Sequence, residues 1–249
     1  MKKIKLSIIM VVKNGLPFIK DALDSYKKQI YRDKELIIVC SPSSDGTEKF
    51  LLNLKNKNKY KIFFDNKSKN KFGSLNKGIS LAKGHYVGIL HSDDIFYSSN
   101  VLKDVSKKIK QTNCDFIYGD CVFVNKKNSK IVREWKSGKF YKNKLKYGWM
   151  PPHTTTFVDR KLLKKDKYNL NYRISGDYEF LLRILNKDLK ISYIKKRICK
   201  MRIGGDSTNF KNIFFKLNED FKIASKYFNF PLITIFFKII QKVNQFKIF

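Results

Sequence analysis

Short apolar runs alternate with amphipathic stretches through the first half of this 249-residue chain. Lys5–Val12 is a continuous apolar run of the kind found in strands that are covered on both faces. Pro17–Ile30 carries apolar residues at helical spacing, with proline near its start. The alternation continues through expected strands at Glu35–Cys40, Tyr60–Phe64, Tyr86–Leu90 and Asp115–Val124, and expected helices at Thr47–Leu54, Ser74–Ala82 and Val101–Ile109. It predicts an α/β fold with a mainly parallel sheet flanked by helices, whose functional site lies at the carboxyl ends of the strands.

The second half of the chain differs in composition and in its pattern of apolar residues. Residues 126–149 are basic and aromatic, and the chain from Lys211 onward is basic with helical periodicity. Between them we expect an extended segment at Thr155–Val158, a helix at Asp177–Leu185, and strands at Ile191–Ile194 and Cys199–Ile203. The pattern indicates a main domain over residues 1–210, with halves 1–124 and 125–210, and a C-terminal helical extension over residues 211–249.

The charge of the chain is strongly basic. Lys and Arg number 53 against 21 Asp and Glu, a formal net charge of +32. Such a field attracts nucleic acid, anionic lipid headgroups or diphosphate substrates, although a lysine-rich composition also arises from coding bias, with the lysines merely solvated. The four cysteines lack CxxC spacing, which favours a reducing compartment without a disulfide framework or zinc site. We expect no signal peptide, and no segment reaches the ~20 apolar residues of a membrane-spanning helix.

Two adjacent carboxylates follow the expected strand Tyr86–Leu90, in the segment His91-Ser92-Asp93-Asp94. Carboxylates at the end of a buried strand are unfavourable without a counter-charge, and hard oxygen ligands suit Mg²⁺ or Mn²⁺. Such an ion bridges a carboxylate to a substrate diphosphate and neutralises a leaving group. In the structural alternative, Asp94 caps the helix that follows.

Three other segments carry weaker signals. Ser43–Thr47 opens a helix, so its amides and hydroxyls either contact a nucleotide or form an ordinary capping loop. Glycines on both sides of Asn76 allow close approach of the backbone near the same edge. Asp177, in Ser175–Glu179, is either a general base toward an acceptor hydroxyl or a helix-start residue that interacts with the macrodipole.

Taken together, these segments resemble family 2 glycosyltransferases of the GT-A fold. The resemblance covers residues 5–210 and rests on Ser7–Asn14, Ala22–Ser25, Gln29, Glu35–Val39, Ser43–Thr47, Gly73–Ile79, Ala82–Tyr86, His91–Asp94, Ser175–Glu179 and Gly204–Ser207. It implies inverting transfer of a sugar from a nucleotide-diphosphate sugar to a hydroxyl of a glycan or polyprenyl-diphosphate-linked acceptor. Residues 1–124 would bind the nucleotide sugar, and residues 125–210 the acceptor.

The resemblance also assigns roles to individual residues. Asp177 is the expected catalytic base, and Asp93 and Asp94 are the expected ligands of Mg²⁺ or Mn²⁺. His153 and Trp149 are expected near the acceptor or the diphosphate, with a purely structural role as the alternative for His153. The expected donor-binding residues are Val11, Lys13, Asn14, Ser41, Asp45, Asn76, His91, Asp93 and Asp94.

Two positions depart from the family pattern. Ser41 stands where the family usually has an aspartate that contacts the nucleotide base. His91 stands where the metal motif usually begins with Asp or Asn. The nucleotide base and the choice between Mg²⁺ and Mn²⁺ therefore stay open.

The C-terminal segment Phe228–Phe249 places lysines among apolar residues at helical spacing. A helix of this kind lies in an anionic bilayer interface or packs on the domain with its lysines outward. We expect a cytoplasmic protein attached peripherally to the inner face of a bacterial plasma membrane, where it builds a surface polysaccharide.

Two other classes of protein fit parts of the sequence. A charge of +32 with 14% aromatic residues suggests a nucleic-acid-binding protein. The aromatic residues fall mostly inside apolar runs, however, as core residues do, so we expect no nucleic-acid partner. A nucleotidyltransferase that makes the sugar nucleotide needs a Gly- and Lys/Arg-rich triphosphate loop, of which Lys13-Asn14-Gly15 is a poor version.

Overall fold

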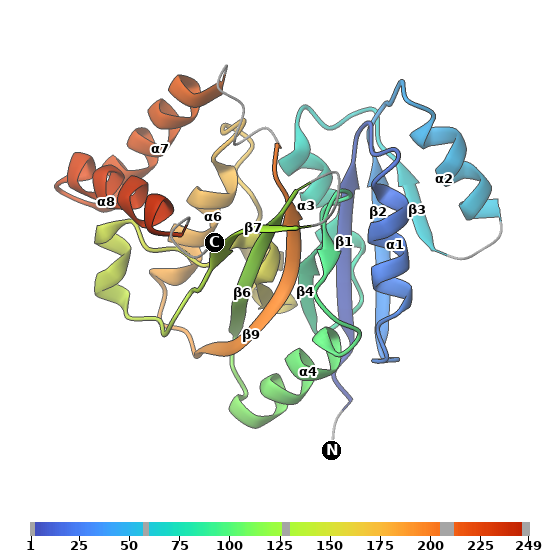
Figure 1. Cartoon of the computed structure of the whole chain (residues 1–249), viewed down its shortest axis with the longest axis horizontal. Coiled ribbons are helices and arrows are strands. Elements are labelled where there is room, and N and C mark those ends of the chain that lie inside the picture. Colours follow the sequence, from blue (N-terminus) through green and yellow to red (C-terminus); the bar gives the residue numbers. More distant parts are fainter. Residues whose placement is uncertain (1–2, 57–59, 126–129, 205–211, 246–249) are drawn as a thin grey trace.

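The computed structural model describes residues 3–56, 60–125, 130–204 and 212–245. In these residues a single sheet carries helices on both of its faces (Figure 1). Its strands are β1 (Leu6–Val12), β2 (Lys34–Cys40), β3 (Lys61–Phe64), β4 (Tyr86–Ile89), β5 (Ile95–Phe96), β6 (Phe116–Val124), β7 (Ile131–Trp135), β8 (Phe157–Asp159) and β9 (Ile191–Arg202). The helices are α1 (Ile19–Lys27), α2 (Thr47–Asn56), α3 (Lys71–Leu81), α4 (Val101–Thr112), α5 (Arg160–Lys165), α6 (Gly176–Leu185), α7 (Ile213–Tyr227) and α8 (Pro231–Asn244), with 3₁₀ helices η1 (Lys142–Tyr147) and η2 (His153–Thr155).

The strand order is β3-β2-β1-β4-β8-β6-β9-β5, and β7 pairs with the C-terminal residues Cys121–Val124 of β6. The strands β3, β2, β1 and β4 are parallel, as the sequence predicts for the first half. The short strand β8 runs antiparallel to both β4 and β6, while β6 and β9 are parallel to each other. The expected α/β fold with flanking helices is confirmed, and the complete sheet is mixed because β8 runs antiparallel to its neighbours. The apolar pattern of a short buried strand does not reveal its direction.

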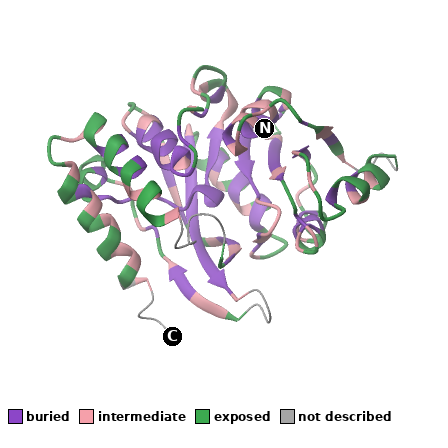
Figure 2. Cartoon of the chain, turned by 90° about the horizontal axis from the view of Figure 1, so that it is seen from above, coloured by how far each residue is buried: buried purple, intermediate pink, exposed green. Residues whose placement is uncertain are grey.

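The two faces of the sheet bury separate apolar clusters. In β1, the side chains of Ile8 and Met10 belong to the cluster on the α1 and α4 face, whereas Ile9 belongs to the cluster on the α3 and α6 face. This alternation explains why the strand reads as a continuous apolar run, since neither face is exposed to water. In Figure 2 the buried strands occupy the middle of the molecule.

One expected boundary is wrong. The segments Ile191–Ile194 and Cys199–Ile203 were expected as two strands, but they belong to the single strand β9. The polar residues between them interrupt the apolar pattern at a shift in the register with β6, where Arg197 lies opposite Asp120. The Arg197 side chain binds the buried Glu134 at 2.7 Å, so its charge is compensated within the sheet.

The C-terminal extension forms a hairpin of α7 and α8 that packs on η1 and α6. The Thr234 hydroxyl donates to the Lys146 carbonyl at 2.7 Å, and the Gln241 amide donates to the Tyr147 carbonyl at 2.6 Å. The expectation that a packed tail turns its lysines outward is wrong for Lys238, whose ammonium group lies 3.1 Å from the centre of the Tyr178 ring. Its charge is tolerated there because Asp220 lies 3.0 Å away.

The predicted boundary at residue 210, like the segment Gly205–Ser207 of the family pattern, lies outside the described residues. Within the described ranges, no helix combines the length and the apolar character needed to cross a bilayer.

Candidate active site

A tight turn follows β4 at the carboxyl edge of the sheet. The Leu90 amide continues the pairing with β1 by donating to Ile9, and the Asp94 amide then closes the turn by donating to the carbonyl of His91. The turn places His91 and Asp93 half-buried at the edge, while the Asp94 side chain is only 2% exposed. The two adjacent carboxylates therefore have different environments.

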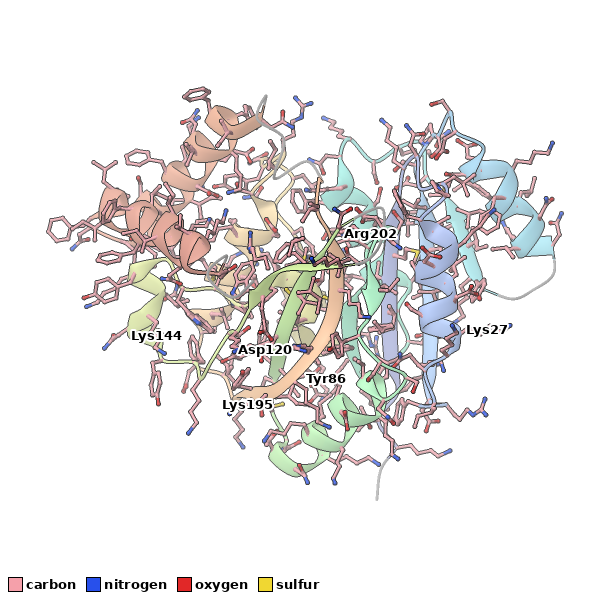
Figure 3. The ribbon with its side chains drawn as sticks, in the orientation of Figure 1. Lys27, Tyr86, Asp120, Lys144, Lys195 and Arg202 are labelled. Atoms are coloured by element: carbon pink, nitrogen blue, oxygen red, sulfur yellow. The ribbon has the colours of Figure 1, made fainter. Side chains whose placement is uncertain are left out.

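Asp94 points toward β9 and is held there by Arg202. The Arg202 amide donates to Oδ1 of Asp94 at 3.2 Å, and the guanidinium donates to the Asp93 carbonyl at 2.8 Å and to the Asp21 carboxylate on α1 at 2.5 Å. Burial raises the pKa of Asp94 well above its usual value, with a further contribution from Asp93. Arg202 thus joins α1, β9 and the turn near the middle of the molecule (Figure 3).

The histidines His91 and His153 lie beside the predicted base. Their ring centres are 6.2 Å apart, and the charge of Asp177 acts on both rings. Burial lowers the pKa of His91, although Asp93 and Asp177 act in the opposite direction. Burial also lowers the pKa of His153 to about 4, so both imidazoles are neutral at pH 7.

The His153 ring is fixed by aromatic residues. Its Nε2 atom is 2.5 Å from the Tyr168 hydroxyl, and Tyr168 stacks on Phe180 with ring centres 4.2 Å apart. The backbone of Tyr168 is in turn held by both ends of the Asn76 amide, at 2.8 and 2.9 Å. Asn76, expected to bind the donor, therefore braces the wall that positions His153.

Asp177 lies at the first turn of α6 and is half-buried. Burial by itself raises its pKa, but nearby positive charges outweigh this effect and lower it below the usual value. The lowering comes from the His153 ring, which carries a positive charge only when it is protonated at low pH, and from the ammonium groups of Lys71, Lys216 and Lys238. Asp177 is consequently an ionised carboxylate at neutral pH, the form that a general base requires.

The loop before Asp177 is tied to α7. The buried carboxylate of Glu219 accepts the backbone N–H groups of Arg173, Ile174 and Ser175 at 2.6, 2.9 and 2.7 Å. Hydrogen bonds from three successive amides to one carboxylate fix the backbone that leads into α6. The C-terminal hairpin thereby takes part in positioning the candidate base.

The loop after β2 interlocks with the loop after β1. The Asp45 carboxylate accepts the amides of Leu16 and Thr47 at 2.9 and 3.0 Å, and the Asn14 side chain accepts the Ser44 amide at 2.8 Å. Val11 is half-buried and Lys13 is exposed next to this junction. The loop residues expected to bind the donor are therefore brought together, with Asp45 and Asn14 also serving as braces.

Ser41 lies beside a buried carboxylate that the sequence reading overlooked. Its hydroxyl is 3.4 Å from that of Ser74, which donates to Asp65 at 3.3 Å. Asp65 is 3% exposed and forms an ion pair with Lys77 at 3.3 Å. The position where the family usually has an aspartate thus has an acidic side chain from the neighbouring strand end nearby.

Trp149 does not lie among these polar residues. It is 8% exposed, its indole N–H donates to the Ser137 carbonyl at 2.7 Å, and its ring packs edge-on against Tyr118. Its polar atom is therefore already engaged within the core. A pocket elsewhere, lined by residues of α4 and β9 such as Asp104 and Ile198, contains none of the predicted site residues.

Comparison with known proteins identifies the family. The model of glycosyl transferase family 2 matches residues 7–169 of the chain. The chain belongs to this family. This family 2 glycosyltransferase is 28% identical to an uncharacterised glycosyltransferase of Methanocaldococcus jannaschii. The aligned 210 residues cover 82% of this chain and 72% of that relative. It is 29% identical to WfgD of Escherichia coli, a UDP-Glc:alpha-D-GlcNAc-diphosphoundecaprenol beta-1,3-glucosyltransferase, over 93% of the chain and 90% of that protein.

Solved structures share the fold of this family 2 glycosyltransferase. A fragment of S. aureus TarS in complex with UDP-GlcNAc superposes with a TM-score of 0.69 at 19% identity, over 90% of this chain and 67% of that one. The mannosyltransferase PcManGT from Pyrobaculum calidifontis, in complex with GDP-Man and Mn²⁺, gives a TM-score of 0.70 at 17% identity, over 94% and 69%. A longer TarS chain is covered to only 43%. The expected GT-A-like fold is confirmed, and family membership decides against the nucleotidyltransferase alternative.

Sequence reading missed four residues that organise the site of this family 2 glycosyltransferase: Lys71, Tyr168, Arg202 and Glu219. Arg202 binds Asp94 across 108 positions, and Glu219 binds the Ser175 amide across 44. No periodicity or short motif carries such a contact. In the described part of the chain, no group of three His, Cys, Asp or Glu side chains has the arrangement of a protein-only metal site.

Proposed function

We propose that this glycosyltransferase moves a sugar from a nucleotide-diphosphate sugar to a hydroxyl of a lipid-linked glycan, with inversion, during synthesis of a bacterial cell-surface polysaccharide. The observation that supports the proposal is the position of His91, which shares a turn with Asp93, has its ring centre 6.2 Å from that of His153, and is influenced by the charges of both Asp93 and Asp177. The donors in the two solved complexes and the diphosphoundecaprenol acceptor in the name of WfgD support the substrate classes.

Asp177 is the proposed catalytic base. Its carboxylate accepts the proton of the acceptor hydroxyl while that oxygen forms a bond to the anomeric carbon. The bond from the anomeric carbon to the donor phosphate oxygen breaks, and the nucleoside diphosphate leaves with the electron pair. The lowered pKa of Asp177 keeps it ionised for this role, and its place at the start of a helix held by Glu219 keeps it oriented.

We propose Asp93 as the protein ligand of Mg²⁺ or Mn²⁺, with Asp94 holding the turn in shape. An ion held by one or two carboxylates and by substrate phosphates needs no protein-only cage, so the half-buried Asp93 and its neighbour fit this donor set. When bound, the metal neutralises charge on the departing diphosphate. Arg202 orients Asp93 through the backbone carbonyl, and neutral His91 donates to or accepts from the donor at the same edge.

We assign the nucleoside pocket to the interlocked loops after β1 and β2. Val11, Lys13, Asn14 and Ser41 remain proposed donor contacts, together with Asp45 as the residue that holds both loops. His153 is proposed to lie at the diphosphate, because its ring is fixed between His91 and Tyr168. No nucleic-acid partner is proposed.

The hairpin of α7 and α8 is proposed to dock on an anionic lipid bilayer at the cytoplasmic face of the plasma membrane. On α8 the inward side carries Thr234 and Lys238, whereas the exposed side chains from Leu232 to Val243 are all apolar, which reverses the usual pattern of a surface helix. Phe214 is 83% exposed, and Leu232 and Phe230 are each 71% exposed. Figure 2 shows the exposed residues along this hairpin near the C-terminus. Aromatic and aliphatic side chains on a protein of net charge +32 fit a headgroup and acyl boundary.

Flotation with phosphatidylglycerol vesicles tests the docking. The wild type should float at low salt, Leu232→Ser should float less, and the matched control Leu52→Ser, at an exposed leucine on α2, should float like the wild type. Protein that stays at the bottom and instead forms dimers in sedimentation would show that a second copy covers the hairpin, and would refute bilayer docking.

A thermal-shift panel of nucleotides and nucleotide sugars with Mg²⁺ or Mn²⁺ tests the enzymatic proposal, because a ligand that binds only the folded state raises its stability. At least one nucleotide sugar should stabilise the protein more than its nucleoside does, and more with metal than with EDTA. The proposal fails if no nucleotide sugar shifts the unfolding temperature.

A further inference from the structure

Three lysines gather around one carboxylate where the hairpin meets α6. The Lys216 and Lys238 ammonium groups lie 2.5 and 3.0 Å from Oδ2 of Asp220, and their side chains are only 14% and 12% exposed. Lys242, one turn beyond Lys238 on α8, is close enough for its charge to act on Lys238. The positive charge of this lysine cluster, defined as Lys216, Lys238 and Lys242, exceeds what Asp220 alone compensates.

The buried ammonium groups of the cluster repel one another, and a bound anion would reduce this repulsion. Burial lowers the pKa of Lys238 to about 7, although Asp220 opposes this, and burial together with Lys216 lowers the pKa of Lys242 to about 8. Burial raises the pKa of Asp220, but Lys238 and Lys216 outweigh it and hold the value at about 2. The buried hydroxyl of Tyr178, under Lys238, has no hydrogen-bond partner in the part of the chain that is described. A ligand with several acceptor oxygens would accept hydrogen bonds from the lysine ammonium groups and from the Tyr178 hydroxyl.

The cluster lies beside Asp177, because the Lys238 ammonium group contacts the ring of the adjacent residue Tyr178. The charges that act most strongly on His91 come from Asp93, Lys71 and Asp177. Those that act on Asp177 include Lys216 and Lys238 as well. Asp177 is therefore adjacent to the lysine cluster and within electrostatic reach of the proposed donor site, as a base must be to receive a proton from an acceptor bound at the cluster.

Apolar surface begins directly beside these lysines. Phe214 and Phe215 precede Lys216 and are 83% and 46% exposed, and Ile239, next to Lys238, is 47% exposed. A ligand whose charged group meets the cluster can thus extend an apolar chain over the outer face of the hairpin. Charged and apolar parts in this order are the chemistry of a lipid diphosphate.

We propose that Lys216, Lys238 and Lys242 bind the diphosphate of a lipid-linked acceptor, whose lipid chain runs over the exposed face of α7 and α8. The inference rests on the proposed function and adds the place where the acceptor is held. Glu219 maintains the geometry, because it ties α7 to the loop that precedes Asp177 and so sets the distance from the phosphates to the base.

Calorimetric titration with geranyl diphosphate in EDTA tests this site. The wild type should bind, the double variant Lys216→Gln/Lys242→Gln should bind about tenfold more weakly or worse, and Lys242→Gln alone, which breaks no ion pair with Asp220, should lose about threefold. The exposed Lys222 on α7 provides the matched control, and Lys222→Gln should bind like the wild type. Wild-type affinity in both cluster variants would overturn the proposal.

Two further arms identify the source of the binding. Asp93→Ala should bind geranyl diphosphate normally, and a loss equal to that of the double variant would place the ligand at the donor site and refute the inference. Inorganic pyrophosphate should bind at least about tenfold more weakly than geranyl diphosphate, because it lacks the apolar chain. Equal binding of the two ligands would refute the proposed contact with the lipid chain.

The failure of this inference can be told apart from failure of the proposed function. If nucleotide sugars stabilise the protein but the lysine variants bind geranyl diphosphate normally, only the acceptor site is refuted. If no nucleotide sugar stabilises the protein, the proposed function is refuted.

Discussion

The substitution Glu219→Gln isolates the link between the C-terminal hairpin and the candidate base. One carboxylate oxygen accepts the Arg173 amide, and the other accepts the amides of Ile174 and Ser175. A glutamine of the same shape has a single acceptor oxygen, so its NH₂ group must oppose at least one backbone N–H. The variant keeps the volume of the side chain and removes only its charge and one acceptor.

The expected loss follows from these contacts. Hydrogen bonds to a charged group contribute about 1.5–3 kcal/mol, and neutral ones about 0.5–1.5 kcal/mol. Losing one bond and neutralising the other two should reduce the free energy of unfolding by about 2–4 kcal/mol. For a chain of this size that lowers the unfolding temperature by about 4–16 °C. Glu219 is only 7% exposed, so water offers little compensation.

Chemical unfolding and steady-state kinetics measure the effect. Because the loop ends two residues before Asp177, kcat should fall about tenfold or more at a temperature where the variant is folded, while the thermal shift with a nucleotide sugar persists. Asp188→Asn, at an exposed acidic residue, is the control and should match the wild type in both assays. A Glu219→Gln protein that unfolds within about 0.5 kcal/mol of the wild type and turns over normally would refute the reasoning.

Three other predictions concern the reacting groups. Asp177→Asn should retain donor binding and lose turnover by about 10²-fold or more, and normal turnover would exclude Asp177 as the base. Asp93→Ala should abolish the metal-dependent part of donor stabilisation, and Arg202→Met should weaken it about tenfold, both in thermal shifts with and without EDTA. Lys238 and Lys242, with pKa values near 7 and 8, lose their charge as pH rises, so kcat/KM for a lipid diphosphate acceptor should fall between pH 7 and 9. A flat profile over that range would argue against the lysines as the phosphate site.

Local patterns in the sequence predicted much of the fold. The apolar run at β1, the helical spacing at α1 and the strand at β6 were all recovered, because side-chain burial on a strand or helix repeats with the period of that element. The single strand β9 was missed where its polar residues interrupt the repeat, since their partner Glu134 comes from another strand. The antiparallel direction of β8 was not predicted, because an apolar pattern contains no information about the direction in which a strand runs.

The candidate site divides in the same way. Asp93 was predicted from its place after a strand, Asp177 from its place at the start of a helix, and His153 from its position in the stretch before that helix. The different environments of Asp93 and Asp94 depend on Arg202, whose amide binds Asp94. The role of Glu219 depends on hydrogen bonds to a loop that lies 44 to 46 positions earlier in the chain. Contacts between residues so far apart in the sequence leave no local pattern in it.

By itself, the sequence determined the layered α/β architecture and the family, and it predicted the candidate reactive side chains, because these depend on residue types at short, regular spacings. Tertiary structure alone decided that Asp94 is turned inward, that Asn76 and Trp149 hydrogen-bond to the backbone of other segments, and that the hairpin buries lysines while exposing apolar residues. The physical reason is that the free energy of a buried charge or amide depends on its partner, and that partner comes from a distant part of the chain.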